Sequence, residues 1–155
     1  MDDDAPYQIE IARVSGHAAV SDAQLTEAVR AALQCRQVAR AQVSVALVDD
    51  AQIAELNQSH LQHAGPTDVL AFDLREREGE PLEGEVVLSV ETARREARQR
   101  GHSEEAELML YAVHGTLHLA GLDDQAPKDA LYMHNLEDEI LTALGVGPVY
   151  GAGQA

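Results

Sequence analysis

The 155-residue sequence has few aromatic residues, a single cysteine and few basic residues. Aromatic side chains make up only 3% of the chain, so aliphatic residues and alanine must fill most of the core. This scarcity also argues against aromatic stacking as the main way of holding nucleic-acid bases. The lone cysteine, Cys35, excludes an internal disulfide and suits a reducing compartment. We expect it to be a small buried residue on a helix.

Long apolar runs and a targeting segment are also missing. No run approaches the roughly 20 residues that a membrane span requires, and MDDDAPYQIE lacks the basic and apolar parts of a signal peptide. We therefore expect a cytoplasmic protein without a membrane partner. Acidic residues outnumber basic ones by 27 to 11, which gives a formal net charge of −16. A chain this acidic repels polyanions, so binding of nucleic acid requires a local basic patch or a metal ion.

The one dense group of basic residues is RREARQR, at 94–100. One interpretation makes it a contact for a phosphate-bearing substrate, with Arg94 as the candidate residue. The other makes it a solvated helix face balanced by nearby acidic residues. Those acidic residues are Glu91, Glu96, Glu104, Glu105 and Glu107.

Hydrophobic periodicity and capping signals predict an α+β fold. The expected strands are 7–14, 42–48, the second half of 61–74 after a turn at Gly65-Pro66, and 85–90. The expected helices are 21–39, 49–60, 91–100, 103–121 and 127–145. This order predicts a single domain, residues 1–146, with a mixed four-stranded sheet and about five helices. The short stretch 147–155 is expected to be a mobile tail.

The segment HGTLHLAGLDD, residues 114–124, contains a candidate metal site at the C-terminal end of a helix. His114 and His118 are four residues apart, which places both imidazoles on one helix face. Gly121 occupies a position where a left-handed residue can end the helix and let the chain fold back. The carboxylate of Asp124 would then return to the imidazoles. The pattern His-x3-His-x5-Asp therefore predicts a metal ion bound by these three residues.

The residue after the first histidine is Gly115, so the general-base glutamate of an H-E-x-x-H peptidase is absent. A metal at this site would have to lower the pKa of water or act as a Lewis acid, with help from another group. A peptidase is therefore disfavoured. The neighbouring Asp123 is either a hydrogen-bond acceptor for a ligand imidazole or a simple turn residue.

The same residues resemble a known family. HGTLHLAGLDD is similar to the H-G-x-L-H-L-x-G-x-D-H signature of the YbeY endoribonuclease and rRNA maturation factor family. A second segment, LNQSHLQHAGPTDVLAFDL, resembles the family's L-N-x-x-[YF]-R-x-K-x-x-P-T-D-V-L-S-F pattern. Its matching residues are Leu56, Asn57, Pro66, Thr67, Asp68, Val69, Leu70 and Phe72. With GEVVLSVETARREA and MHNLEDEIL, the resemblance covers about residues 40–144.

This resemblance implies a small α+β protein with one Zn²⁺ ion, acting as a metal-dependent, single-strand endoribonuclease. It implies a role in 16S ribosomal RNA maturation and ribosome quality control, with ribosomal RNA and small-subunit ribosomal proteins as partners and no DNA. His114 and His118 match the first two zinc ligands of the family. Asp124 occupies the position of the third, so these three residues are the predicted metal-binding and catalytic set.

Two positions depart from the family pattern. Asp124 replaces a histidine, which lowers the formal charge of the bound ion and predicts lower activity or a more alkaline optimum. Leu61 replaces an arginine that the family uses for phosphate binding. His60 and His63 are candidates to replace that cation as substrate-binding residues, or are solvated loop histidines.

Two other functions stay open from the sequence. A ribosome-associated assembly factor with a structural metal and little nuclease activity would explain the two departures. A metallohydrolase for another substrate, such as a peptide, is the third reading and is disfavoured by Gly115.

Overall fold

A computed structural model describes residues 6–61, 68–77 and 79–147 of the protein, with the backbone alone at 59–61. The elements follow in the predicted order β-α-β-α-β-β-α-α-α. The strands are β1 (Tyr7–Arg13), β2 (Ala41–Val48), β3 (Val69–Asp73) and β4 (Leu82–Ser89). The helices are α1 (Asp22–Cys35), α2 (Asp50–Leu61), α3 (Val90–Arg100), α4 (Glu104–Leu119) and α5 (Pro127–Ala143). Beyond Gly147 the predicted tail lies outside the described residues, as does the predicted turn at Gly65-Pro66.

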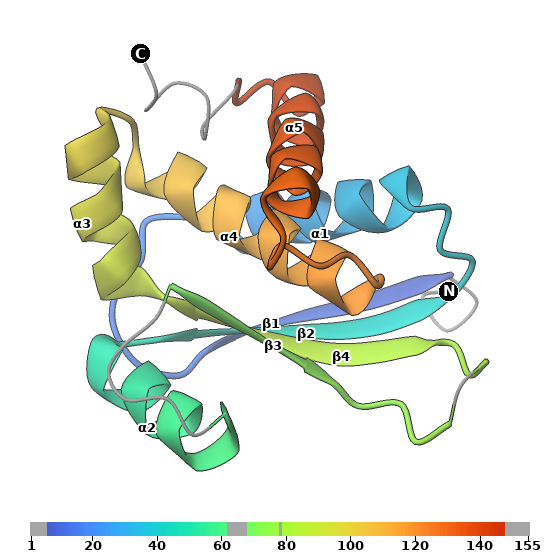
Figure 1. Cartoon of the computed structure of the whole chain (residues 1–155). Coiled ribbons are helices and arrows are strands. Elements are labelled where there is room, and N and C mark those ends of the chain that lie inside the picture. The colour runs from blue at the N-terminus through green and yellow to red at the C-terminus, as the bar shows by residue number, and fades with distance from the viewer. Residues whose placement is uncertain (1–5, 62–67, 78, 148–155) are drawn as a thin grey trace.

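The strands form one mixed sheet in the order β1-β2-β4-β3 (Figure 1). β1 and β2 are parallel, as are β2 and β4, whereas β3 and β4 are antiparallel. In the antiparallel pair, Leu70 lies opposite Val87 and Phe72 opposite Glu85. The predicted α+β class with a mixed four-stranded sheet is therefore confirmed.

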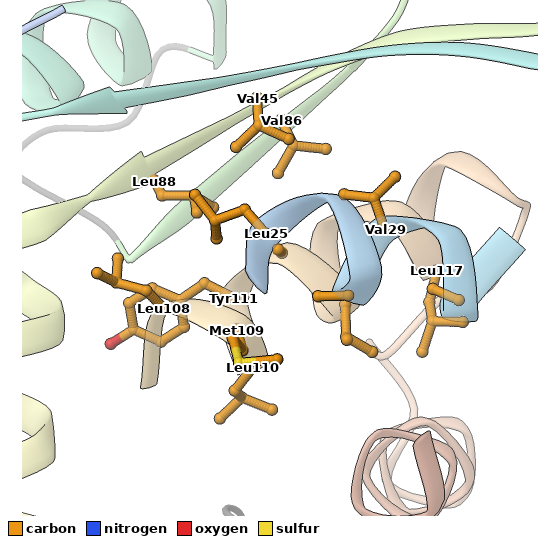
Figure 2. Packing of buried hydrophobic residues seen from close by; sticks show 14 of the residues in the cluster. Leu25, Val29, Val45, Val86, Leu88, Leu108, Met109, Leu110, Tyr111 and Leu117 are labelled. Carbon is orange, nitrogen blue, oxygen red and sulfur yellow. The ribbon is translucent and has the colours of Figure 1, made fainter. Parts of the chain in front are cut away.

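The helices cover the two faces of the sheet unequally. α1, α4 and α5 lie over one face with α3 beside α4, whereas α2 lies on the other face (Figure 1). Figure 2 shows the larger core, in which side chains of α1 and α4 meet those of β2 and β4, with Tyr111 as the one labelled aromatic residue. A smaller cluster lies under α2 and consists of Ala46, Val48, Ile53, Leu70 and Val87. Aliphatic side chains and alanine thus fill most of both cores, as the composition predicts.

The helix ends carry the capping groups that the sequence predicts. Ser21 Oγ accepts a hydrogen bond from the backbone N–H of Gln24 at 3.1 Å, and Gln24 Oε1 accepts one from the backbone N–H of Ser21 at 2.9 Å. This reciprocal pair is a capping box and starts α1. Ser103 caps α4 with a bond of 3.0 Å from the backbone N–H three residues on. Pro127 begins α5 at a position where its missing N–H costs nothing.

None of the helices that the structure describes is long and apolar enough to cross a membrane.

Cys35 lies near the end of α1. The expectation that it is buried is wrong, because its side chain is exposed. The buried stripe of α1 ends at Leu33. A residue two positions further along lies about 200° around the helix, so Cys35 points away from the core.

Glu107 is a charged residue inside the core, near the start of α4, with a fully buried side chain. Arg100 Nη1, at the end of α3, lies 3.1 Å from its Oε2, and His102 Nε2 contacts its Oε1. A buried carboxylate is tolerated only when it is paired and hydrogen-bonded. These contacts therefore join the end of α3 to the start of α4.

We predict that Arg100→Met lowers the free energy of unfolding by about 3 kcal/mol, because it leaves Glu107 buried with one cationic partner fewer. Urea denaturation followed by circular dichroism measures this change. Arg98→Met is the matched control, since Arg98 is exposed and makes no hydrogen bond or ion pair in the described part of the chain. Equal stability of the two variants would contradict a structural role for this ion pair.

Candidate metal centre

Gly115 allows α4 to lie directly against the sheet. A Cβ at this position would lie 2.5 Å from Val86 Cγ1 and 3.2 Å from Val69 Cγ2. His114 and His118 lie on another side of the helix, with ring centroids 4.6 Å apart. In the H-E-x-x-H pattern the residue after the first histidine is the general base. Here that position is turned into the sheet, so a glutamate would have no room and no access to the imidazoles.

The turn after α4 brings Asp124 back to the two histidines. The N–H of Gly121 donates to the carbonyl of His118, and the next N–H donates to the carbonyl of Leu117, each at 3.0 Å. These two bonds form a Schellman motif, in which Gly121 has the left-handed φ of 103°. Asp124 Oδ2 then lies 3.4 Å from His114 Nε2 and 3.5 Å from His118 Nε2. The predicted reversal of the chain at Gly121 is confirmed.

The three donor atoms form a triangle that suits a tetrahedral metal ion. The two Nε2 atoms are 3.1 Å apart, and the distances to Asp124 Oδ2 are 3.4 and 3.5 Å. Ligand atoms about 2.0–2.1 Å from a tetrahedral ion are about 3.3–3.4 Å from one another. The triangle therefore matches one face of such a tetrahedron, with a nitrogen and oxygen donor set that zinc accepts. In the part of the chain that the structure describes, no other three His, Cys, Asp or Glu residues have donor atoms that all lie within 4.8 Å of one another.

Further contacts hold the two imidazoles from the side opposite to the triangle. The carbonyl oxygen of Leu122 accepts a hydrogen bond from His118 Nδ1 at 2.9 Å. A carboxylate oxygen of Glu137, on α5, accepts one from His114 Nδ1 at 2.5 Å. We assign the protons to the Nδ1 atoms because both partners are acceptors. Each Nε2 is then the atom that faces the shared centre, as metal binding requires.

The site is electrostatically negative apart from its imidazoles. Burial alone lowers the pKa of His114, but the hydrogen bond and charge of Glu137, together with the charges of Asp124 and Asp68, outweigh it and raise the pKa above its usual value. His114 therefore binds a proton more readily than a free histidine does. A metal ion must compete with this proton for Nε2, and the surrounding carboxylates favour either cation.

Arg94 does not lie near this triangle. Its guanidinium pairs with Glu104 at 3.1 Å and donates to a backbone carbonyl of the loop before α1 at 2.8 Å. Glu104 begins α4, ten residues before His114, which corresponds to about 15 Å along the helix axis. Arg95 and Arg100 are likewise paired with carboxylates of neighbouring elements. These arginines therefore have carboxylate partners, as the balanced-face interpretation expects, and contact of Arg94 with substrate stays a prediction.

The other predicted substrate contacts are not described. His63 lies outside the described residues, and so do the side chains of His60 and Leu61 on the last turn of α2. Asp68 is described: it is exposed, accepts the backbone N–H of Val69 at 2.8 Å, and is close enough for its charge to act on the imidazole of His114. Contact of the two histidines with substrate stays a prediction.

Asp123 acts as a turn residue. Its Oδ1 accepts the backbone N–H of Gln125 at 3.1 Å. The imidazoles take their supporting bonds from Leu122 and Glu137 instead. Of the two readings of Asp123 from the sequence, the simple turn aspartate fits the structure.

Two residues of α5 at the site were missed from the sequence. Glu137 is 1% exposed and contacts His114, and His134 Nδ1 lies 2.8 Å from the other oxygen of Glu137. A signal was present, because Glu137 lies four residues after the buried Met133 and three before the buried Ile140. A glutamate in the apolar stripe of a helix must have polar partners, which here come from α4 and from α5 itself.

The profile of the family described as Endoribonuclease YbeY matches residues 10–145 of the chain. The chain belongs to the YbeY endoribonuclease family. The family indicated by the histidine signature and the PTDVLAF segment is therefore confirmed, and the match includes both segments. Members of the family are enzymes that cleave RNA internally.

Individual YbeY relatives support this membership. The Endoribonuclease YbeY of Desulfitobacterium hafniense strain Y51 is 44% identical over 115 residues, which span 68% of this chain and 73% of the relative. That of Pelotomaculum thermopropionicum is 37% identical over 148 residues, spanning 88% and 96%. The solution structure of TM1509 from Thermotoga maritima is similar to this chain with a TM-score of 0.58 and 27% identity, over 92% of this chain and 95% of that one.

We predict that Gly115→Ala lowers the free energy of unfolding by about 1–3 kcal/mol, because the added Cβ overpacks the contact with Val86. The sign is informative, since glycine to alanine inside a helix ordinarily stabilises by about 0.5–1 kcal/mol. Urea denaturation measures the change. The double variant with Val86→Ala should lose less stability than the sum of the two single losses, because the smaller side chain makes room for the added Cβ. A Gly115→Ala variant more stable than the parent chain would refute the close contact.

Removal of the third donor gives a direct test of the triangle. We expect Asp124→Ala to bind clearly less than one zinc ion per chain after dialysis, because only two of three donors remain. The matched control is Asp123→Ala, which should keep its zinc because, among the described residues, Asp123 bonds to the turn and to neither imidazole. Metal analysis of the dialysed proteins provides the measurement. Unchanged zinc in Asp124→Ala would show that Asp124 is not a ligand.

Proposed function

We propose that this chain is a metal-dependent endoribonuclease that cleaves single-stranded RNA during 16S ribosomal RNA maturation and ribosome quality control. It acts in the cytoplasm with ribosomal RNA and small-subunit ribosomal proteins as partners. The observation that supports this most is the agreement between the signature and the geometry. His114, His118 and Asp124 align with the metal ligands in the signature of a family of RNA-cleaving enzymes. In this chain their donor atoms lie at the mutual distances expected of ligands around a tetrahedral ion.

His114, His118 and Asp124 would hold one Zn²⁺ ion, with a fourth coordination position left for water or a phosphate oxygen. When bound, the ion would supply Lewis acidity toward the phosphodiester and lower the pKa of attacking water. Glu137 and the carbonyl of Leu122 orient the two imidazoles for this role. Since Gly115 provides no general base, any proton transfer has to use another group.

The acidic surface sets a condition on how RNA approaches. The formal net charge of −16 repels the substrate at long range, and the arginines of α3 at 94, 95 and 100 are paired with carboxylates. Local attraction then depends chiefly on the metal ion. His60, on the last turn of α2, and His63 remain the proposed additional contacts to phosphate.

A second function is favoured by one observation, the leucine at position 61 where the family pattern has an arginine. Leucine cannot bind phosphate, so the chain could keep its fold, its metal and its ribosomal contacts with little nuclease activity. In that case the protein is an assembly factor and the metal is structural. Nuclease and assembly factor differ in one measurable property, which is chelator-sensitive RNA cleavage.

The test is incubation of the purified, zinc-loaded protein with single-stranded RNA, with and without a chelator. We expect cleavage that the chelator abolishes and added zinc restores. Zinc at full stoichiometry without cleavage would support the assembly factor instead. Asp124→Ala serves as the matched inactive control in the same assay.

We further predict that Asp124→His together with Leu61→Arg raises the cleavage rate on the order of 10-fold or more. This is the size expected from regaining a charge-assisted contact to phosphate and one unit of formal charge on the ion. Initial rates on one RNA substrate, at equal zinc occupancy, give the comparison. Leu61→Lys is a useful companion variant, since it restores charge without the paired donors of arginine. No gain in the double variant would show that the two departures do not limit activity.

A further inference from the structure

Glu137 is a buried carboxylate whose two oxygens are shared between two imidazoles. Its side chain is 1% exposed and lies in the apolar stripe of α5. Oε2 contacts His114 Nδ1 at 2.5 Å, and Oε1 contacts His134 Nδ1 at 2.8 Å. In the described part of the chain these are its polar contacts. Each oxygen of this carboxylate therefore depends on one imidazole for its hydrogen bond.

His134 supports the metal centre without belonging to it. It lies one turn before Glu137 on α5, and its ring is nearly parallel to that of His114, with 16° between the planes and 6.4 Å between the centroids. It is not among the three residues whose donor atoms cluster within 4.8 Å of one another. Its side chain is 22% exposed, so it closes the outer side of the carboxylate.

The arrangement fixes a torsion that would otherwise be free. The last torsion of a glutamate side chain has a broad distribution, so a carboxylate with a single partner can rotate. A bond from His134 to Oε1 holds Oε2 toward His114. The ring of His114 is then fixed through Nδ1, and its Nε2 stays 3.1 Å from Nε2 of His118.

We propose that His134 is a positioning residue of the metal centre, which acts through Glu137 to hold the ring of His114 in the orientation that binds metal. This inference rests on the proposed metal site and adds a residue that lies outside the histidine signature. Partners of ligand histidines typically change metal affinity 10- to 100-fold when they are removed. His134 acts one step further from the metal, so a smaller effect is expected.

The test measures zinc affinity alone, by competition with a chromogenic chelator in the absence of RNA. His134→Leu should weaken zinc binding by roughly 3- to 10-fold, less than the loss of a direct partner of a ligand histidine. His134→Asn should keep most of the affinity of the parent chain, because the side-chain amide nitrogen of asparagine can take the place of Nδ1 in the bond to Glu137. The matched control is Asn135→Leu, an exposed neighbour on the same helix, which should leave the affinity unchanged.

Glu137→Gln should weaken zinc binding 10- to 100-fold, and the double variant with His134→Leu should be no weaker than Glu137→Gln alone. Parent-like zinc affinity in His134→Leu, even with reduced stability, would overturn the inference. Additive losses in the double variant would do the same, because His134 would then act without Glu137. A parent chain that binds no zinc would instead overturn the proposed metal centre, and this inference with it. Because no RNA is present, absence of nuclease activity has no bearing on the result.

Discussion

The backbone of α4 approaches the sheet more closely than a side chain would allow, and the position of every donor follows from that approach. A Cβ at Gly115 would lie 2.5 Å from Val86, and one at Gly84 would lie 2.6 Å from the side chain of Leu119. Of the 16 residues of α4, 12 are buried, so the helix cannot shift without opening the core. The side of the helix that carries His114 and His118 is thereby turned toward α5, and the turn at the C-terminal end lies beside the same two residues.

The turn and the carboxylate that arrange the candidate metal ligands also stabilise the fold. The Schellman turn at Gly121 ends α4, and it also delivers Asp124 to the imidazoles and the carbonyl of Leu122 to His118. Glu137 places a charge inside α5, where an apolar residue would stabilise the helix more simply. Its contact with His114 gives that charge a partner and connects α5 to α4. Folding and metal binding would be coupled in such a site, because the contacts that satisfy buried polar atoms also orient the candidate ligands.

The fold was predictable because its signals are local. Alternation marked the strands, and caps such as Ser21 and Ser103 marked the helix starts, so the element order was correct. The donor triangle was also predictable, since an i, i+4 pair and a helix-ending glycine determine where Asp124 can reach. The partner of His114 was not, because Glu137 is 23 residues away on another helix and no periodicity connects them.

The density of charges along the sequence does not show which charges are paired in space. From the sequence, the arginines of 94–100 could form a phosphate contact or a balanced helix face. In the structure Arg94 pairs with Glu104, and Arg95 pairs with Asp50, which lies 45 residues earlier in the chain. The prediction for Cys35 was wrong for a related reason: the helix was predicted correctly, but the extent of its buried stripe was not. Both cases depend on which helix face meets the rest of the protein, and that is decided by tertiary contacts.

The two departures from the family pattern act in the same electrostatic direction. An aspartate in the third ligand position lowers the formal charge of a bound dication from +2 to +1. A leucine at position 61 removes a fixed cation that phosphate would meet, and Asp68 and Glu137 add negative charge around His114. With an ion at the proposed site, the pull on an RNA phosphate would then come chiefly from the residual charge of that ion. Since that charge would be small, its effect would depend strongly on where the ion is held, and the bonds that fix His114 and His118 would then contribute to function through the ligands.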